Sequence, residues 1–217
     1  MELLVLARHG YAHSNRDVLA SSSPPGRGLT PEGIEQAQRL REELAGTRVD
    51  LGVATSFART RETLELALDG REVPTIVVTE LDEIDFGGFD GGSLDAYRAW
   101  AVEETPLAPA PGGGESRADA AARFARGLRL VLARPEEVVL LVGHALALRY
   151  VLDAASGRPP AARMAPVEHA RPHLLRAARV EDAARLLEEW SQSPAPRFRD
   201  PSSEGTAGPA TGRRSPR

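Results

Sequence analysis

The sequence of 217 residues contains no cysteine. Disulfides, a thiolate nucleophile and cysteine-based zinc sites are therefore excluded. It also contains no lysine, because all 27 lysine-or-arginine positions are arginine. This second absence excludes a Schiff base and a lysine-bearing phosphate loop. A protein of this composition that handles phosphate has to use arginine, histidine and backbone amides, and the arginine fork suits phosphate because it donates two parallel hydrogen bonds.

Long apolar runs are missing as well. No stretch of eighteen apolar residues occurs, and the run Leu3–Ala7 is too short and begins too early for a signal peptide. The formal net charge of −4, with no polybasic run outside the C-terminal segment, argues against nucleic-acid and membrane partners. We therefore expect a cytoplasmic protein with one large domain, since the chain is long enough to bury a full core.

Two short apolar runs each end at a histidine. Leu3–Ala7 is followed by Arg8–His9–Gly10, and Val138–Val142 is followed by Gly143–His144. Each run is too short for a helix and rich in strand-forming residues, so each is predicted to be a buried strand. Open α/β sheets build their sites beyond the carboxyl ends of parallel strands. We therefore expect both histidines in one catalytic site.

The rest of the chain alternates between predicted strands and helices. This alternation predicts an α/β fold, a three-layer sandwich with a mostly parallel central sheet and helices on both faces. The catalytic domain is predicted over residues 1–192, and the Pro/Ser/Arg-rich segment 193–217 is predicted to be a disordered tail. Further strands are predicted at 51–55, 75–79 and near 173–176. Helices are predicted from 31, at 58–68, from a capping box at 116–119 until Pro135 ends the helix, after the strand 138–142 through about 152, and at 180–190.

The segment Leu29–Gly33 has the signals of a helix start. Thr30 is predicted to cap the helix, Pro31 suits the first helical position, and Glu32 suits the positive end of the helix dipole. The residues that follow recur at helical spacing and predict an apolar face toward the core. That predicted face consists of Ile34, Ala37, Leu40 and Leu44.

Six short segments between about residue 3 and residue 152 contain the motifs of the chain. They are Arg8–His9–Gly10 with Asn15, Leu29–Gly33 with Gln36–Ala37, Thr55–Arg59 with Thr63, Leu81–Gly87, Gly113–Ser116 and Val142–His144. Together and in this order they resemble motifs of the histidine phosphatase superfamily, which includes cofactor-dependent phosphoglycerate mutases and many small phosphatases. The resemblance therefore extends over most of the predicted domain.

The resemblance implies hydrolysis of a phosphate ester with neither metal nor cofactor. His9 would be the nucleophile and form a phosphohistidine, for which one ring nitrogen must hold a proton toward a fixed acceptor while the other attacks. Glu83 would protonate the leaving oxygen and then act as base toward water. Positive or polar groups would surround the non-bridging oxygens. These phosphate contacts would come from Arg8, Asn15, Arg59 and His144, the last as a third hydrogen-bond donor.

A catalytic role for Glu83 and a metal site at two later histidines each compete with a simpler interpretation. Glu83 lies in the acidic stretch 80–85, so a solvated acidic loop is the alternative to a proton donor. His169 and His173 have the spacing of helical metal ligands, but Pro166 and Pro172 break that helix and no third ligand is evident. A zinc site is therefore not predicted.

The chain departs from the mutase pattern at three positions. Tyr11 and Ala12 stand where mutases usually have a glutamate and a hydroxyl residue, and Ile84 stands where they tend to have arginine. These departures favour a phosphatase acting on a small phosphorylated metabolite, with a mutase or a non-catalytic phosphate-binding regulator as alternatives. Sugar phosphates, nucleotides and cofactor-precursor phosphates all stay open as substrates, and a homodimer is a candidate assembly.

Overall fold

A five-stranded sheet forms the centre of the computed structural model, which describes residues 1–163 and 165–194. The strand order is β3-β2-β4-β1-β5, with β5 antiparallel to β1 and the other neighbours parallel. The predicted mostly parallel sheet is thus confirmed. The predicted disordered tail lies, apart from Ser193 and Pro194, outside the described residues. The strands are β1 Leu3–Arg8, β2 Leu51–Ala54, β3 Thr75–Val77, β4 Val138–Gly143 and β5 Pro172–Arg176.

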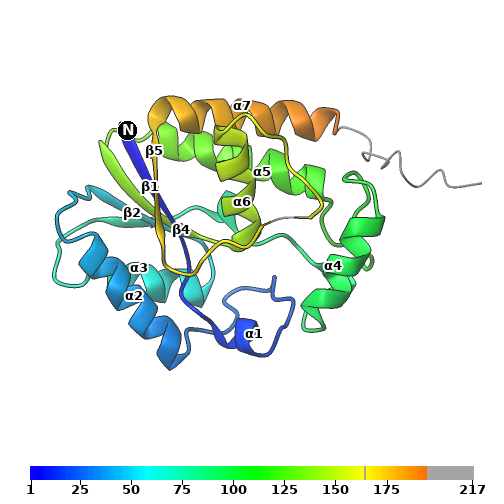
Figure 1. The fold of residues 1–217 in the computed structure, drawn as a ribbon, viewed down its shortest axis with the longest axis horizontal. Helices are drawn as coiled ribbons and strands as arrows, with labels where there is room; N and C mark the ends of the chain where they lie inside the picture. Colours follow the sequence, from blue (N-terminus) through cyan, green and yellow to red (C-terminus); the bar gives the residue numbers. More distant parts are fainter. Residues whose placement is uncertain (164, 195–217) are drawn as a thin grey trace, which may run out of the picture.

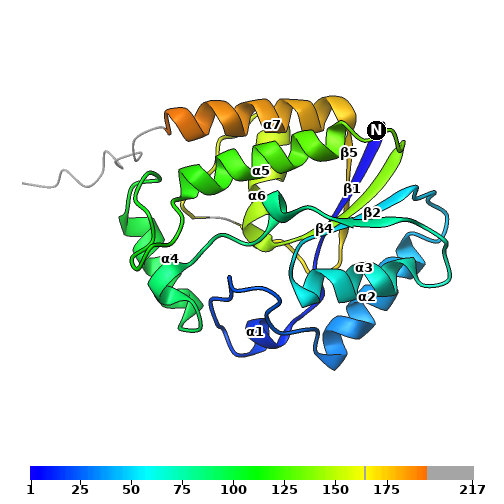
Figure 2. The ribbon, with the colours of Figure 1, turned by 180° about the vertical axis from the view of Figure 1, so that it is seen from behind.

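Helices cover both faces of this sheet, as Figures 1 and 2 show from opposite sides. The helices α2 and α3 lie on one face, and α5, α6 and α7 lie on the other. The predicted three-layer α/β sandwich is confirmed. Within the described residues no helix is long and apolar enough to cross a membrane. The helices are α1 His13–Arg16, α2 Pro31–Glu43, α3 Ala58–Leu68, α4 Leu94–Glu103, α5 Arg117–Leu132, α6 Ala145–Ala155 and α7 Ala177–Gln192, with 3-10 turns at Thr79–Leu81 and Gly87–Phe89.

The side chains of the two central strands alternate between two apolar clusters. Leu4 and Leu6 of β1 pack with helices α5, α6 and α7, whereas Val5 and Ala7 pack with α2 and α3. β4 alternates in the same way, because successive strand residues point to opposite faces. This double burial explains why both strands are continuous apolar runs rather than alternating ones.

The first turn of α2 packs directly on the loop after β1. Thr30 caps the helix as predicted, because its Oγ1 accepts a hydrogen bond from the Gly33 amide at 3.2 Å. The same hydroxyl donates to the carbonyl oxygen of Tyr11 at 2.9 Å. The prediction that Ile34 belongs to the core face is wrong, because Ile34 is 40% exposed. Gly33 lies against the Tyr11 backbone instead, which turns the buried face toward Ala37, Leu40 and Leu44.

Gly33 is the position where this packing admits no side chain. A Cβ added to Gly33 would overlap the Tyr11 carbonyl oxygen, which belongs to the backbone and cannot rotate away. We expect Gly33→Ala to lower the free energy of unfolding by about 1–3 kcal/mol, the usual cost of overpacking. The measurement is urea unfolding beside the control Gly46→Ala, since a Cβ at Gly46 meets no atom within 4 Å. Equal effects at both glycines would contradict this account of the contact.

Helix α4 was not predicted from the sequence. It is short, and only Tyr97 and Ala101 of it are buried. Aromatic contacts hold it against the loop that precedes it: the ring centroids of Tyr97 and Phe86 lie 4.6 Å apart, and those of Trp100 and Phe89 lie 5.7 Å apart. These contacts join side chains from separate elements, so no helical spacing in the sequence indicates them.

Candidate active site

Adjacent parallel strands bring His9 and His144 together. β1 and β4 pair with Arg8 opposite Gly143, so each histidine is the first residue after its strand. The His9 amide donates to the Gly143 carbonyl at 3.0 Å, and the two imidazole centroids lie 5.5 Å apart. The strands lie side by side in Figure 1. His9 also lines a cavity of about 100 Å³ together with Arg8, Asn15, Arg59 and Glu83, whereas the predicted site residue His144 is fully buried and is not part of the cavity lining.

The hydrogen bond of His9 fixes its tautomer. Its Nδ1 lies 2.7 Å from the Gly10 carbonyl oxygen, which can only accept, so Nδ1 holds the proton and Nε2 keeps its lone pair. Burial, with the nearby positive charges of Arg59 and Arg8, holds the pKa of His9 well below its usual range. The ring is therefore neutral near pH 7. A neutral imidazole with a free Nε2 is a competent nucleophile.

Two polar side chains hold the loop that follows His9. The Gly10 amide donates to Thr63 Oγ1 at 2.9 Å, and this hydroxyl donates in turn to the Arg59 carbonyl at 2.6 Å. The Tyr11 amide donates to Gln36 Oε1 at 2.8 Å. The loop is thus tied to α3 on one side and to α2 on the other. These ties give a physical role to the threonine and glutamine in two of the sequence motifs.

Arg59 and His144 contact each other inside the site. Arg59 NH2 donates to His144 Nδ1 at 3.2 Å and to the Ser21 carbonyl at 3.1 Å. Because a guanidinium only donates, Nδ1 of His144 is the acceptor and its proton is on Nε2, 2.9 Å from Thr55 Oγ1. Burial, with the charges of Arg59 and Arg8, lowers the pKa of His144 well below its usual range. In this arrangement His144 orients Arg59.

The guanidinium of Arg8 is held at one nitrogen and is without a partner at another. Its Nη1 donates to the Val167 carbonyl at 2.8 Å, whereas its Nε is buried and has no hydrogen-bond partner among the described residues. Burial lowers the pKa of Arg8 to about 10, so the guanidinium stays charged at neutral pH. Asn15 lines the same cavity and accepts from the Ala12 amide through Oδ1 at 3.0 Å. An anion in the cavity would therefore meet a fixed positive charge beside a fixed amide.

Glu83 lies on the cavity wall and not in solvent. Its side chain is 12% exposed, and its Oε2 is 3.9 Å from His144 Nδ1. Oε1 accepts from the Ile84 amide at 3.1 Å. Burial raises the pKa of Glu83 above that of an ordinary glutamate. The side chain therefore has both the place and the raised pKa that a proton donor requires.

Arg123 holds the loop that contains Glu83. Its guanidinium donates to the carbonyl oxygens of Asp82 at 2.9 Å and of Glu83 at 3.2 Å. It also forms a two-point ion pair with Glu115, at 2.9 and 2.6 Å. Glu115 belongs to one of the sequence motifs, but the residue that pairs with it on α5 had no signal in the sequence.

His169 is a site residue that the sequence did not indicate. Its Nδ1 donates to the His9 carbonyl oxygen at 2.7 Å, and its ring lies edge-on to those of His9 and Tyr11 at 5.5 and 5.4 Å. Burial lowers the pKa of His169 to about 4. His169 thus supports His9 and the loop that follows it, through this hydrogen bond and through ring packing, as a neutral imidazole. Residues 1–163 and 165–194 contain no group of three or more His, Asp or Glu side chains that could hold a metal ion.

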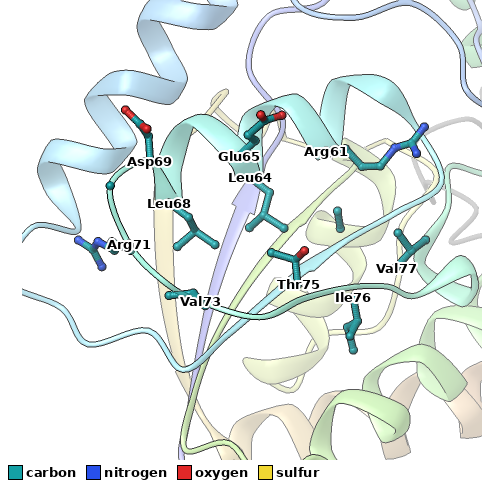
Figure 3. Close-up of a pocket in the computed structure, with 12 residues that line it drawn as sticks. Arg61, Leu64, Glu65, Leu68, Asp69, Arg71, Val73, Thr75, Ile76 and Val77 are labelled. Atoms are coloured by element: carbon teal, nitrogen blue, oxygen red, sulfur yellow. The ribbon is translucent and has the colours of Figure 1, made fainter.

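A second, larger hollow of about 500 Å³ lies between α3 and the edge strand β3. Figure 3 shows Leu64 and Leu68 pointing from α3 toward this strand, with charged side chains at the rim. None of the predicted catalytic or phosphate-binding residues lines this hollow. The chemistry is therefore concentrated at the smaller cavity around His9.

Comparison with known proteins agrees with this geometry. The family model for the histidine phosphatase superfamily (branch 1) matches residues 4–192. The chain belongs to this superfamily. The matched range begins within β1 and ends at the last residue of α7.

Within the histidine phosphatase superfamily, relatives include both phosphatases and mutases. The chain is 30% identical over 169 residues to the adenosylcobalamin/alpha-ribazole phosphatase of Escherichia coli, a match that covers 72% of this chain and 80% of the relative. It is 32% identical over 171 residues to a 2,3-bisphosphoglycerate-dependent phosphoglycerate mutase of Methylobacterium, covering 71% and 81%. The alpha-ribazole phosphatase structure from Shigella flexneri superposes with a TM-score of 0.69 at 29% identity, covering 79% and 89%. Family and relatives together support a phosphoric monoester hydrolase.

Proposed function

We propose that this histidine phosphatase is a metal-independent phosphomonoesterase that hydrolyses a small phosphorylated metabolite through a phosphohistidine on His9. The observation that supports this most strongly is the 2.7 Å bond from His9 Nδ1 to the Gly10 carbonyl. It leaves Nε2 unprotonated at a cavity that is also lined by Arg8, Arg59 and the protonatable carboxyl of Glu83. A nucleophile, positive charge and an acid are the three requirements of phosphate-ester cleavage.

The reaction proceeds in two displacements. His9 Nε2 attacks phosphorus, the ester P–O bond breaks, and the leaving oxygen takes the proton of Glu83. Water then attacks the phosphohistidine and gives a proton to Glu83, while the N–P bond breaks and inorganic phosphate leaves. Arg8, Arg59 and Asn15 surround the non-bridging oxygens in both steps. His144 donates to them only after Nδ1 gains a proton, which the dianionic phosphoryl group favours.

A mutase is the second candidate, because one of the relatives is a mutase. The cavity wall favours the phosphatase. Ile84, directly after the proposed acid, is fully buried and presents an apolar surface to the cavity. Tyr11 packs its ring on His169 rather than lining the cavity. Neither residue provides the polar contacts with which a mutase holds and returns the phosphoryl group.

We expect phosphatase activity to persist in EDTA. The charge of the phosphoryl group is met by Arg8 and Arg59, so no divalent ion is needed to stabilise it. The measurement is phosphate release from a panel of phosphomonoesters, with and without chelator. Alpha-ribazole phosphate belongs in this panel because the Escherichia coli relative is named for it. Activity that disappears in EDTA and returns with magnesium would contradict metal independence.

The proposal also covers the cellular location and the partners of the enzyme. We place it in the cytoplasm, with a small phosphorylated substrate as its partner and no role for nucleic acid or membranes. The net charge of −4 supports this assignment, because it does not attract polyanions. A homodimer stays a candidate assembly.

A further inference from the structure

The cavity has a second part that the proposed chemistry does not use. The nucleophile, the acid and the phosphate-binding residues account for one portion of its lining. The remaining wall comes from four separate segments: the loop after α1, the loop after Glu83, helix α4 and the start of α6. Its side chains are mostly apolar, and the alcohol portion of a bound phosphomonoester must lie against them. They are Leu19, Ile84, Phe86, Leu94, Tyr97 and Leu146.

This apolar wall has few ways to bind a polyhydroxylated alcohol. A hydroxyl that leaves water for an apolar surface loses hydrogen bonds that the surface does not replace. An apolar alcohol gains free energy from the same surface in proportion to the area it buries. The wall therefore favours an alcohol whose body is apolar over a sugar or glycerol.

One charged residue, Arg98, also lines the cavity. It belongs to α4, its side chain is 63% exposed, and its NH1 contacts Asp95 at 3.0 Å. An exposed ion pair of this kind is weak, so Arg98 can exchange Asp95 for a ligand at little cost. Its positive charge also reaches into the cavity, where it is one of the causes that lower the pKa of Arg8.

A simple phosphomonoester has no anionic group left to offset the positive charge of Arg98. His9 and His144 are neutral before the substrate binds, and Glu83 is protonated when it acts as the acid. A phosphomonoester has a charge between −1.5 and −2 near pH 7, which Arg8 and Arg59 offset. Arg98 is then an additional positive charge beside the apolar wall, where a second anionic group of the substrate would lie.

We propose, building on the phosphatase function above, that the preferred substrate is a phosphomonoester whose alcohol has an apolar body and a second anionic group bound by Arg98. Arg98 is thus a specificity-determining residue, while the apolar wall selects the body of the alcohol.

Four phosphates of primary alcohols test this inference, because their leaving oxygens are similarly basic. Benzyl phosphate should exceed glycerol 1-phosphate in kcat/KM by roughly 10- to 100-fold, the range over which apolar pockets discriminate. 4-Carboxybenzyl phosphate should exceed 4-methylbenzyl phosphate roughly tenfold, as expected for one charge-assisted hydrogen bond. If kcat/KM for glycerol 1-phosphate equals or exceeds that for benzyl phosphate, the proposed preference for an apolar body is overturned. If kcat/KM is equal for the two substituted esters, the proposed second anionic group is overturned.

Variants of Arg98 then assign the preference to one side chain. In Arg98→Gln the ratio of kcat/KM between the carboxy and methyl esters should fall to about one. In Arg98→Lys, which keeps the charge, part of the ratio should remain. The matched control is Arg39→Gln on α2, an exposed arginine outside the cavity, for which the full ratio is expected. An unchanged ratio in Arg98→Gln would overturn the assignment.

The test separates this inference from the phosphatase function itself. p-Nitrophenyl phosphate serves as the general probe, since it needs little help from an acid. If the folded protein hydrolyses neither this probe nor any benzyl ester, the phosphatase proposal fails and this inference fails with it. Hydrolysis of the probe without the predicted selectivity would overturn the inference alone.

Discussion

Replacing His9 with glutamine is expected to lower turnover on the order of 10⁶-fold, the size of loss seen when a covalent catalyst is deprived of its nucleophile. Glutamine keeps a polar side chain of similar length, but its amide nitrogen has no available lone pair with which to attack phosphorus. The measurement is kcat for p-nitrophenyl phosphate, with thermal unfolding recorded in parallel. The parallel record is needed because His9 is 2% exposed and its replacement disturbs a packed site.

His13→Gln is the matched control for this variant. His13 is the first residue of α1, four positions after His9, and does not line the cavity, so we expect near-normal turnover from this variant. A folded His9→Gln protein that keeps more than a few per cent of the activity would show that another group attacks phosphorus.

Replacing Glu83 with glutamine should cost roughly 10²- to 10⁴-fold in the phosphorylation step with benzyl phosphate, the usual contribution of a general acid. Benzyl alcoholate is a poor leaving group and needs the proton. p-Nitrophenolate leaves without one, so the same variant should lose much less with that ester. The two esters should be compared by the rate of phosphoenzyme formation in a single turnover, because Glu83 also serves as the base toward water in the second step.

The pH profile gives a second readout of Glu83. A carboxyl whose pKa is raised stays protonated to higher pH than an ordinary glutamate, so kcat/KM should fall as pH rises through that pKa. In Glu83→Gln this limb should vanish, and any limb that remains belongs to the ionisation of the substrate. Asp85→Asn, an exposed acid two residues away, is the control. Equal losses of Glu83→Gln with benzyl and p-nitrophenyl phosphate would indicate lost positioning, and no loss with either ester would show that Glu83 is not the proton donor.

The parts of the site that could be predicted depend on strand ends. His9 and His144 each follow an apolar run, and parallel pairing of β1 with β4 necessarily places the two residues side by side. The helix-start signals around Thr30 act within a few residues, so they too are visible in the sequence.

The parts that could not be predicted are contacts between distant elements. His169 donates to the carbonyl of a residue 160 positions away, and Arg123 donates to a carbonyl 40 positions away. Neither pair has a periodicity or a motif. The apolar wall also depends on distant elements, because four segments contribute to it and each supplies only one or two of its six apolar residues. Even the position of Ile34 depends on such a contact, since the close approach of Gly33 to Tyr11 decides which face of α2 is buried.

The central claim is the covalent phosphohistidine, and direct trapping of it is the sharpest measurement. Enzyme mixed briefly with ³²P-labelled substrate and quenched in alkali should retain label, because phosphohistidine is stable to base and labile to acid. Peptide mapping by mass spectrometry should place the phosphoryl group on His9, and the label should be absent from His9→Gln. Label on any other residue, or label that persists in His9→Gln, would contradict the mechanism.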